Sequence, residues 1–207
     1  MVGFVDGNRR APLQERSRIR VNRILSSTAA LLASVSPEKI SMRKIATTAN
    51  VSVGTIYQFF ENKSAVIDAL GESFEAAILK RCRDSITVSL AKKDLTQFVV
   101  QLMMAIDDTQ REHKGFICIV RGNHHSHFTE LVVRVRGKIK NHLEDTLQKA
   151  YPDIDQVSYQ ITVSIFESSA MAIVRDLPLH GDPSREQYLK ASVEMLSTFL
   201  EKRLSSD

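Results

Sequence analysis

Cysteine, proline, glycine and tryptophan are scarce in this sequence of 207 residues. It has two cysteines, five prolines, eight glycines and no tryptophan. Cys82 and Cys118 are too few for a disulfide framework, so we expect both to be ordinary packed thiols. Few helix breakers, many helix-forming residues and no alternating Val, Thr and Tyr runs favour helices over strands. We therefore predict an all-α fold.

Long apolar runs are also absent. No run approaches the roughly 18 apolar residues that a membrane-spanning helix needs. The arginine-rich start is not followed by the apolar segment of a secretory signal. We therefore expect no membrane partner and a cytoplasmic location. With 43% hydrophobic residues, the chain can still bury a sizeable core.

Charge is divided unevenly along the chain. Residues 1–63 contain ten Lys and Arg against four Asp and Glu, whereas residues 64–207 contain 18 against 20. The first segment therefore carries a charge of +6 and the second −2. A basic stretch alone is usually a solvated surface, but it is also the electrostatic pattern expected for binding a polyanion such as DNA.

The segment 38–63 lies at the end of this basic stretch and indicates a helix-turn-helix. Ser41 is a good N-cap for a helix over 42–49. Asn50 tolerates the left-handed backbone conformation that a tight turn requires. Two short helices joined by such a turn can place the second helix in the major groove of DNA.

The second helix is expected over 53–60, capped by Ser52. Gly54 is unusual there, because glycine disfavours a helix, but its missing side chain allows the backbone to approach a phosphate or a base edge. Asn62 can cap a third helix that begins with Lys63, where an ammonium and free backbone amides can face a phosphate.

These residues resemble the DNA-binding signature of the TetR family of transcriptional regulators, in segments 40–46, 51–60 and 62–63. The resemblance covers the first third of the chain closely and the remainder only in helix content, length and arrangement. At Phe59 the sequence departs from the family pattern, which usually has Tyr or His. By position, the resemblance implies phosphate contacts from Ser41, Tyr57 and Lys63, and base contacts from Arg43, Val53, Gly54 and Thr55.

We also expect the chain to divide into segments with different functions. We expect a flexible N-terminal arm at 1–12, a helix-turn-helix DNA-binding domain at 13–63, and a larger helical domain for effector binding and dimerisation at 64–207. The implied function is that of a ligand-responsive, sequence-specific regulator, by family default a repressor, which releases a palindromic operator when its effector binds.

The effector pocket is expected among the middle helices, although each candidate residue could equally be ordinary core. Their character predicts a small, mostly apolar effector whose identity stays open. No cofactor is expected. The candidates are Phe74, Phe98, Leu102, Met103, Ile106, Phe116, Val120, His124 and Phe128.

The last two helices are expected to form a homodimer. They are apolar on more than one face, and a pair from each of two chains would make a four-helix bundle. The alternative is that they pack entirely within one monomer. Candidates for the interface are Ile161, Ile165, Ala172, Val193, Leu196 and Leu200.

Two other functions compete with this interpretation. The cluster His124, His125 and His127, with Cys118 and His113 nearby, could make a metal-responsive regulator, although its spacing is not that of a compact zinc site. An architectural DNA-binding protein would show the same basic N-terminus but would select no sequence. An enzyme is not expected, since the sequence has no glycine-rich phosphate loop, nucleophile elbow or convincing pair of carboxylates.

Overall fold

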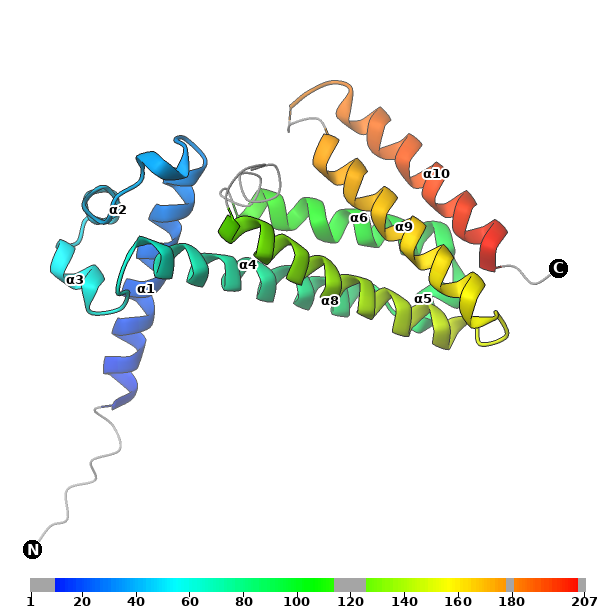
Figure 1. The fold of residues 1–207 in the computed structure, drawn as a ribbon, viewed down its shortest axis with the longest axis horizontal. Helices are drawn as coiled ribbons and strands as arrows, with labels where there is room; N and C mark the ends of the chain where they lie inside the picture. Colours follow the sequence, from blue (N-terminus) through cyan, green and yellow to red (C-terminus); the bar gives the residue numbers. More distant parts are fainter. Residues whose placement is uncertain (1–9, 114–125, 178–180, 205–207) are drawn as a thin grey trace, which may run out of the picture. The chain divides into compact units, whose positions relative to one another are not determined.

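The computed structural model describes residues 10–113, 126–177 and 181–204 (Figure 1). Every regular element in these ranges is a helix, and they contain no strand, which confirms the predicted all-α fold. The chain divides into two compact units. The boundary falls inside one long helix, between Ser73 and Phe74.

The N-terminal unit contains three helices, a short 3-10 helix and the start of a fourth helix. The first helix begins at Arg10, so the end of the predicted arm is helical, while residues 1–9 lie outside the described residues. The compact unit runs as far as Ser73 of α4, and Val66, Ile67 and Leu70 at the start of that helix are buried. Its elements are α1 (Arg10–Leu32), η1 (Pro37–Lys39), α2 (Met42–Ala49), α3 (Val53–Tyr57) and the beginning of α4 (Lys63–Ser85).

The predicted capping residues of α2 and α3 are confirmed. The backbone N–H of Lys44 donates to Ser41 Oγ at 3.2 Å, and that of Thr55 donates to Ser52 Oγ at 3.0 Å. Asn50 ends α2 in the left-handed conformation, with φ 50° and ψ 52°. Local sequence therefore accounts for both ends of the turn between α2 and α3.

Helix α3 is shorter than predicted. It ends at Tyr57, and the next residues form a turn in which the backbone N–H groups of Phe59 and Phe60 both donate to the carbonyl oxygen of Ile56. Phe60, which follows this turn, is nevertheless buried.

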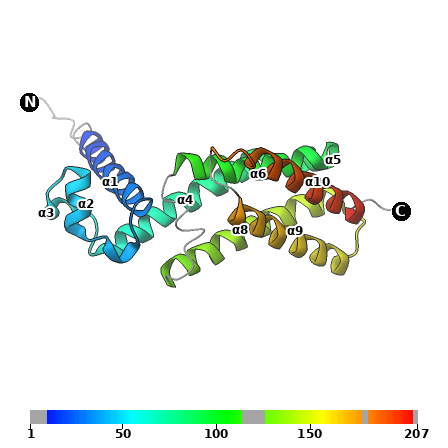
Figure 2. The same cartoon turned by 90° about the horizontal axis from the view of Figure 1, so that it is seen from above.

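The C-terminal unit consists of packed helices around one apolar core. Helix α10 packs along α6 and α9, and α8 packs against α5 and α9 (Figures 1 and 2). Helix α5 was not separated from its neighbours by the sequence pattern. The core draws on all of these helices and on the second half of α4. The elements are α5 (Val88–Lys93), α6 (Leu95–Glu112), α8 (Ser126–Ala150), α9 (Gln156–Asp176) and α10 (Arg185–Leu204).

Helix α9 is apolar on two faces. By length and composition alone, it is the one helix of the described residues that could cross a membrane, and 44% of its apolar window is buried inside the protein. Phe166 and Val163 lie in the core, whereas Ile161 and Ile165 are exposed. The buried half identifies α9 as a core helix, and the exposed half is an apolar surface.

Candidate nucleic-acid interface

The helix-turn-helix is held together by four apolar side chains. Ile45 and Ala49 lie four residues apart on α2, and Ile56 and Phe60 have the same spacing in and after α3. All four are buried. Because the face that carries these four side chains is buried in the core, the other faces of α2 and α3 lie toward the solvent.

The predicted DNA-contact residues lie on those remaining faces. The side chain of Arg43 extends from an exposed position on α2, and Tyr57 at the end of α3 is 55% exposed although it is a large aromatic residue. Phe59 is only half-buried. Of the seven predicted residues, Ser41, Arg43, Gly54 and Tyr57 are exposed, and Val53, Thr55 and Lys63 are partly buried.

Gly54 is not required by packing within the protein. A Cβ atom built at this position would meet only Ser52 Oγ, at 3.8 Å, which is ordinary van der Waals contact. The backbone of α3 is therefore open to the outside at Gly54.

Lys63 and Asn62 form the start of α4. Asn62 Oδ1 accepts a hydrogen bond from the backbone N–H of Ala65 at 3.0 Å, so the predicted cap is confirmed. The ammonium of Lys63 donates to the carbonyl oxygen of Pro37, at 3.1 Å. This contact was not predicted, because nothing in the sequence relates residues 26 positions apart.

Five of the predicted effector residues are core residues. Phe98, Leu102, Met103 and Ile106 lie on α6, and they are buried in the core of the C-terminal unit. Phe74 on α4 is also buried. Phe128 belongs to α8. Phe116, Val120 and His124 lie outside the described residues.

The predicted interface residues fall into two groups. Leu196 and Leu200 are buried within one protomer and have no surface for a partner to cover, and Val193 is partly buried. Ile161, Ile165 and Ala172 on α9 are exposed. The exposed apolar surface of α9 and α10, with the exposed percentage of each residue, comprises Val157 (66%), Ile161 (49%), Ile165 (48%) and Met195 (53%).

Three buried carboxylates of the C-terminal unit have arginine or lysine partners, and the sequence pattern did not single them out. Glu75 of α4 accepts hydrogen bonds from Lys138 and from Arg134 of α8, the latter at 2.8 Å. Glu167 of α9 pairs with Arg136, and Asp107 of α6 pairs with Arg185 and Arg111. The signal that could have found them is an acidic residue inside an otherwise apolar helix face.

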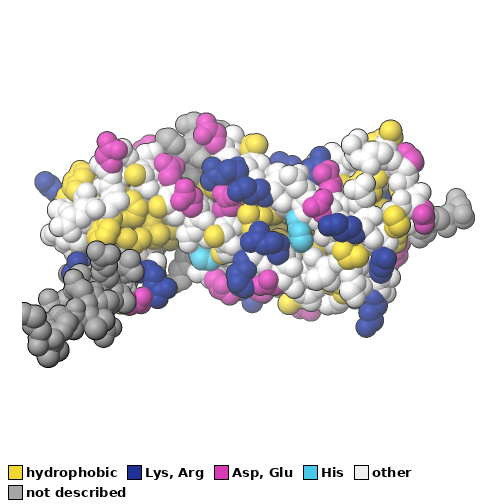
Figure 3. Space-filling model, turned by 90° about the horizontal axis from the view of Figure 1, so that it is seen from below, with side chains coloured by type: hydrophobic (Ala, Val, Ile, Leu, Met, Phe, Trp, Pro, Cys, Tyr) yellow, Lys and Arg dark blue, Asp and Glu magenta, His cyan; other side chains and the backbone are white. Residues whose placement is uncertain are grey.

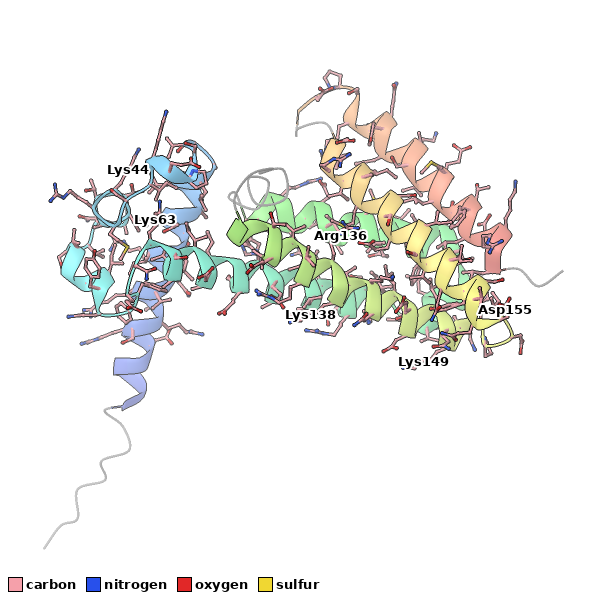
Figure 4. The ribbon with its side chains drawn as sticks, viewed as in Figure 1. Lys44, Lys63, Arg136, Lys138, Lys149 and Asp155 are labelled. Atoms are coloured by element: carbon pink, nitrogen blue, oxygen red, sulfur yellow. The ribbon has the colours of Figure 1, made fainter. Side chains whose placement is uncertain are left out.

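Helix α8 supplies the cations for two of these carboxylates. Arg136 and Lys138 extend from different sides of α8, toward α9 and α4 respectively (Figure 4). On the face drawn in Figure 3, Lys and Arg side chains lie among Asp and Glu side chains. Arg134, Arg136 and Lys138 of α8 are therefore engaged with carboxylates of α4 and α9 within the C-terminal unit.

The predicted alternative metal site cannot be placed. His124 and His125 lie outside the described residues, as does Cys118. Elsewhere, in residues 10–113, 126–177 and 181–204, no group of three His, Cys, Asp or Glu residues could hold a metal ion. Cys82 is free and buried, and burial raises the pKa of its thiol to about 12, so it stays neutral and unreactive.

Comparisons with known proteins point to one family. The family model described as bacterial regulatory proteins, tetR family, matches residues 24–70. The HTH-type transcriptional repressor KstR of Mycolicibacterium smegmatis is 33% identical over 93 residues, which cover 44% of this chain and 46% of the relative. The matched stretch thus spans less than half the length of that relative.

Solved structures share the fold over most of the chain. The fatty acid degradation regulator FadR from Bacillus halodurans has a TM-score of 0.69 at 15% identity, covering 86% of this chain and 94% of its own. SmeT, solved as a complex with triclosan, has a TM-score of 0.67 at 16% identity, covering 89% and 91%. At these identities the likeness concerns the fold.

The family match coincides with the capped helix-turn-helix, and the structural likeness extends to the helices that follow it. The matched family model and the matched relative are both described as regulatory proteins, the class of function that the sequence predicts. Over residues 24–70 the chain matches the tetR family of bacterial regulatory proteins, and over most of its length it shares the fold of the solved structures named above.

Proposed function

We propose that this protein is a cytoplasmic, dimeric, sequence-specific DNA-binding repressor that releases its operator when a small, mostly apolar effector binds. The observation that carries the proposal is the division of the helix-turn-helix into two faces. Ile45, Ala49 and Ile56 are buried, while Arg43 and Tyr57 extend into solvent. A basic segment with a capped helix-turn-helix and an open second helix is suited to the major groove.

Base reading is assigned to the start of α3 and to Arg43 of α2. Arg43 can donate two parallel hydrogen bonds to a guanine, the commonest specific contact in the major groove. Gly54 offers backbone at close range, and Val53 and Thr55 offer small side chains that suit contact with a thymine methyl group. Ser41, Tyr57 and Lys63 are assigned to phosphates, which set the register without reading sequence.

Dimerisation is assigned to the exposed apolar surface of α9 and α10. Val157, Ile161, Ile165 and Met195 are each about half exposed or more, a concentration that is unusual for a surface meant to face water. A second copy of the chain covering it would form an isologous interface. Two α3 helices related by a two-fold axis would then read a palindromic operator in half-sites about one turn apart.

Effector binding is assigned to the helices of the C-terminal unit. The fold is shared with SmeT, which has been solved with triclosan, so this architecture accepts a small organic molecule in at least one relative. The buried residues of α6 are proposed as part of the pocket wall. An effector lowers DNA affinity if it binds preferentially to a conformation that DNA does not.

The experiment compares Arg43→Ala and Tyr57→Ala with the parent protein by fluorescence anisotropy on a matched duplex and on duplexes with one base pair changed per half-site. Arg43→Ala should weaken binding to the matched duplex by about 1–3 kcal/mol and relax preference at one position. Tyr57→Ala should weaken binding to all of these duplexes by the same factor. Equal losses on matched and mismatched duplexes for Arg43→Ala would remove it from the base-reading set.

A further inference from the structure

Lys63 joins the start of α4 to the turn that leads into α2. Its ammonium and the backbone N–H of Ile40 both donate to the carbonyl oxygen of Pro37, at 3.1 Å and 3.2 Å. The bond from Ile40 is the one that closes η1. Because a carbonyl oxygen has two lone pairs, the two donors together use its full capacity.

Helix chemistry alone does not explain a lysine at this position. Lys63 is the first residue of α4, where the free N–H groups carry partial positive charge and disfavour a second cation. Asn62 already caps the helix through the backbone N–H of Ala65. The lysine side chain is partly buried over the N-terminal unit, with its charged end on a backbone carbonyl of a different element.

The hydrogen bond from Lys63 to Pro37 acts on the segment that leads into α2. Pro37 begins η1, and the residue directly after η1 is Ile40, which is 2% exposed and anchored in the core. Ser41 follows at once as the N-cap of α2. The segment entering α2 is therefore held at one end by a buried side chain and at the other by Lys63.

We infer that Lys63 is a positioning residue that holds the N-terminal ends of α2 and α4 at a fixed spacing. These ends carry Ser41 and Lys63 itself, which the proposed function assigns to the DNA backbone, and the inference rests on that function for its effect on DNA. The ammonium has three N–H donors, so two remain for a phosphate after the bond to Pro37. One side chain can thus fix the spacing of the two ends and contact DNA.

The test uses the full-length protein and three variants. Lys63→Met keeps the aliphatic stem and removes every donor, and Lys63→Arg keeps a cationic donor. Lys44→Met is the matched control, since Lys44 is an exposed lysine on α2 and its loss changes the charge equally (Figure 4). The first readout is hydrogen exchange of the Ile40 amide without DNA, which reports opening of η1.

We expect exchange at Ile40 to be at least about tenfold faster in Lys63→Met, restored to within about twofold by Lys63→Arg, and unchanged in Lys44→Met. Equal exchange in Lys63→Met and the parent would overturn the inference. The exchange measurement needs no DNA, so it tests whether Lys63 holds η1 even if the proposed function is wrong.

The second readout is affinity for a selected duplex over a series of salt concentrations. Lys63→Met should weaken binding more than Lys44→Met, although both remove one charge, and Lys63→Arg should recover most of the loss. Indistinguishable affinities for the two methionine variants would show that the hydrogen bond from Lys63 to Pro37 does not contribute to DNA binding. A parent protein that selects no duplex would instead refute the proposed function and leave the exchange result to stand alone.

Discussion

Arg136 of α8 and Glu167 of α9 form a two-pronged ion pair. The Nε–Oε1 distance is 2.8 Å and the Nη2–Oε2 distance is 2.9 Å. The carboxylate is buried, whereas the side chain of Arg136 is 39% exposed. The hydrogen bonds from Arg136 to Glu167 raise the pKa of the guanidinium further above its ordinary value. Removing Arg136 therefore leaves a buried carboxylate without this partner.

Arg136→Met should lower the free energy of unfolding by about 1–2 kcal/mol, because an unpaired buried carboxylate is poorly solvated. The value is below that of a fully buried pair, since water already reaches Arg136. Urea denaturation measures it. Arg175→Met is the control: it breaks an exposed pair with Asp176 and should have no measurable effect. Similar losses in both variants would contradict the assignment.

Glu75 predicts a loss of stability in acid. Burial alone would raise the pKa of its carboxyl, but hydrogen bonds from Lys138 and Arg134 lower it overall, below the ordinary value of 4.5. A carboxyl with a lowered folded-state pKa stabilises the fold above its unfolded pKa, and that contribution disappears as the pH falls through the folded-state value. Stability should therefore decline below about pH 4.5, and Glu75→Gln should flatten the decline. Parallel pH profiles for the two proteins would contradict this.

Gly54→Ala should separate stability from DNA binding. The new Cβ meets only Ser52 Oγ, and alanine favours a helix, so stability should be unchanged or higher by up to about 1 kcal/mol. DNA affinity should fall at least about tenfold if backbone approaches the groove here. Thermal unfolding and anisotropy on the same preparation give both values. Unchanged affinity would mean that nothing approaches Gly54 closely.

Asn50 should tolerate glycine but not alanine. Its φ of 50° lies in the left-handed region, which costs a residue with an ordinary Cβ about 1–2 kcal/mol. Asn50→Ala should therefore lower the unfolding free energy by about 1 kcal/mol, and Asn50→Gly should change it little. Chemical denaturation of the two variants side by side tests this, and equal stabilities would contradict it.

Ile165→Asp should abolish the proposed dimer. A carboxylate at the centre of an apolar interface would be buried without a partner, whereas in a monomer it would remain in water. Sedimentation velocity should show a dimer for the parent and a monomer for the variant. Val133→Asp is the control, because Val133 is an exposed valine on α8, outside the proposed surface. A parent protein that sediments as a monomer would contradict the proposed dimer and its palindromic operator.

The features best predicted from sequence were local. Ser41, Ser52 and Asn62 cap helices through the backbone N–H group three residues later, so their role follows from a few adjacent residues. Asn50 is similar, because its unusual conformation belongs to one residue. The helix-turn-helix was recognisable because several such signals occur at fixed spacing.

The features that could not be predicted depend on helix packing. Leu196 and Leu200 share an apolar pattern with the exposed residues of α9, and only the packed helices show that these two are buried. Along the sequence, the cations of α8 resemble a solvated face, and their carboxylate partners lie on other helices. The bond from Lys63 to Pro37 is of the same kind.

This helix-turn-helix is expected to read DNA sequence as a dimer. The most direct test is selection of the purified protein against random duplex DNA, followed by titration of the enriched duplex and a scrambled duplex at two salt concentrations. We expect an enriched inverted repeat, with half-sites about one helical turn apart and a preference over the scrambled duplex that survives at the higher salt concentration. Failure to enrich any sequence, with binding that is lost equally for both duplexes as salt rises, would contradict it and favour a protein that binds DNA by charge alone.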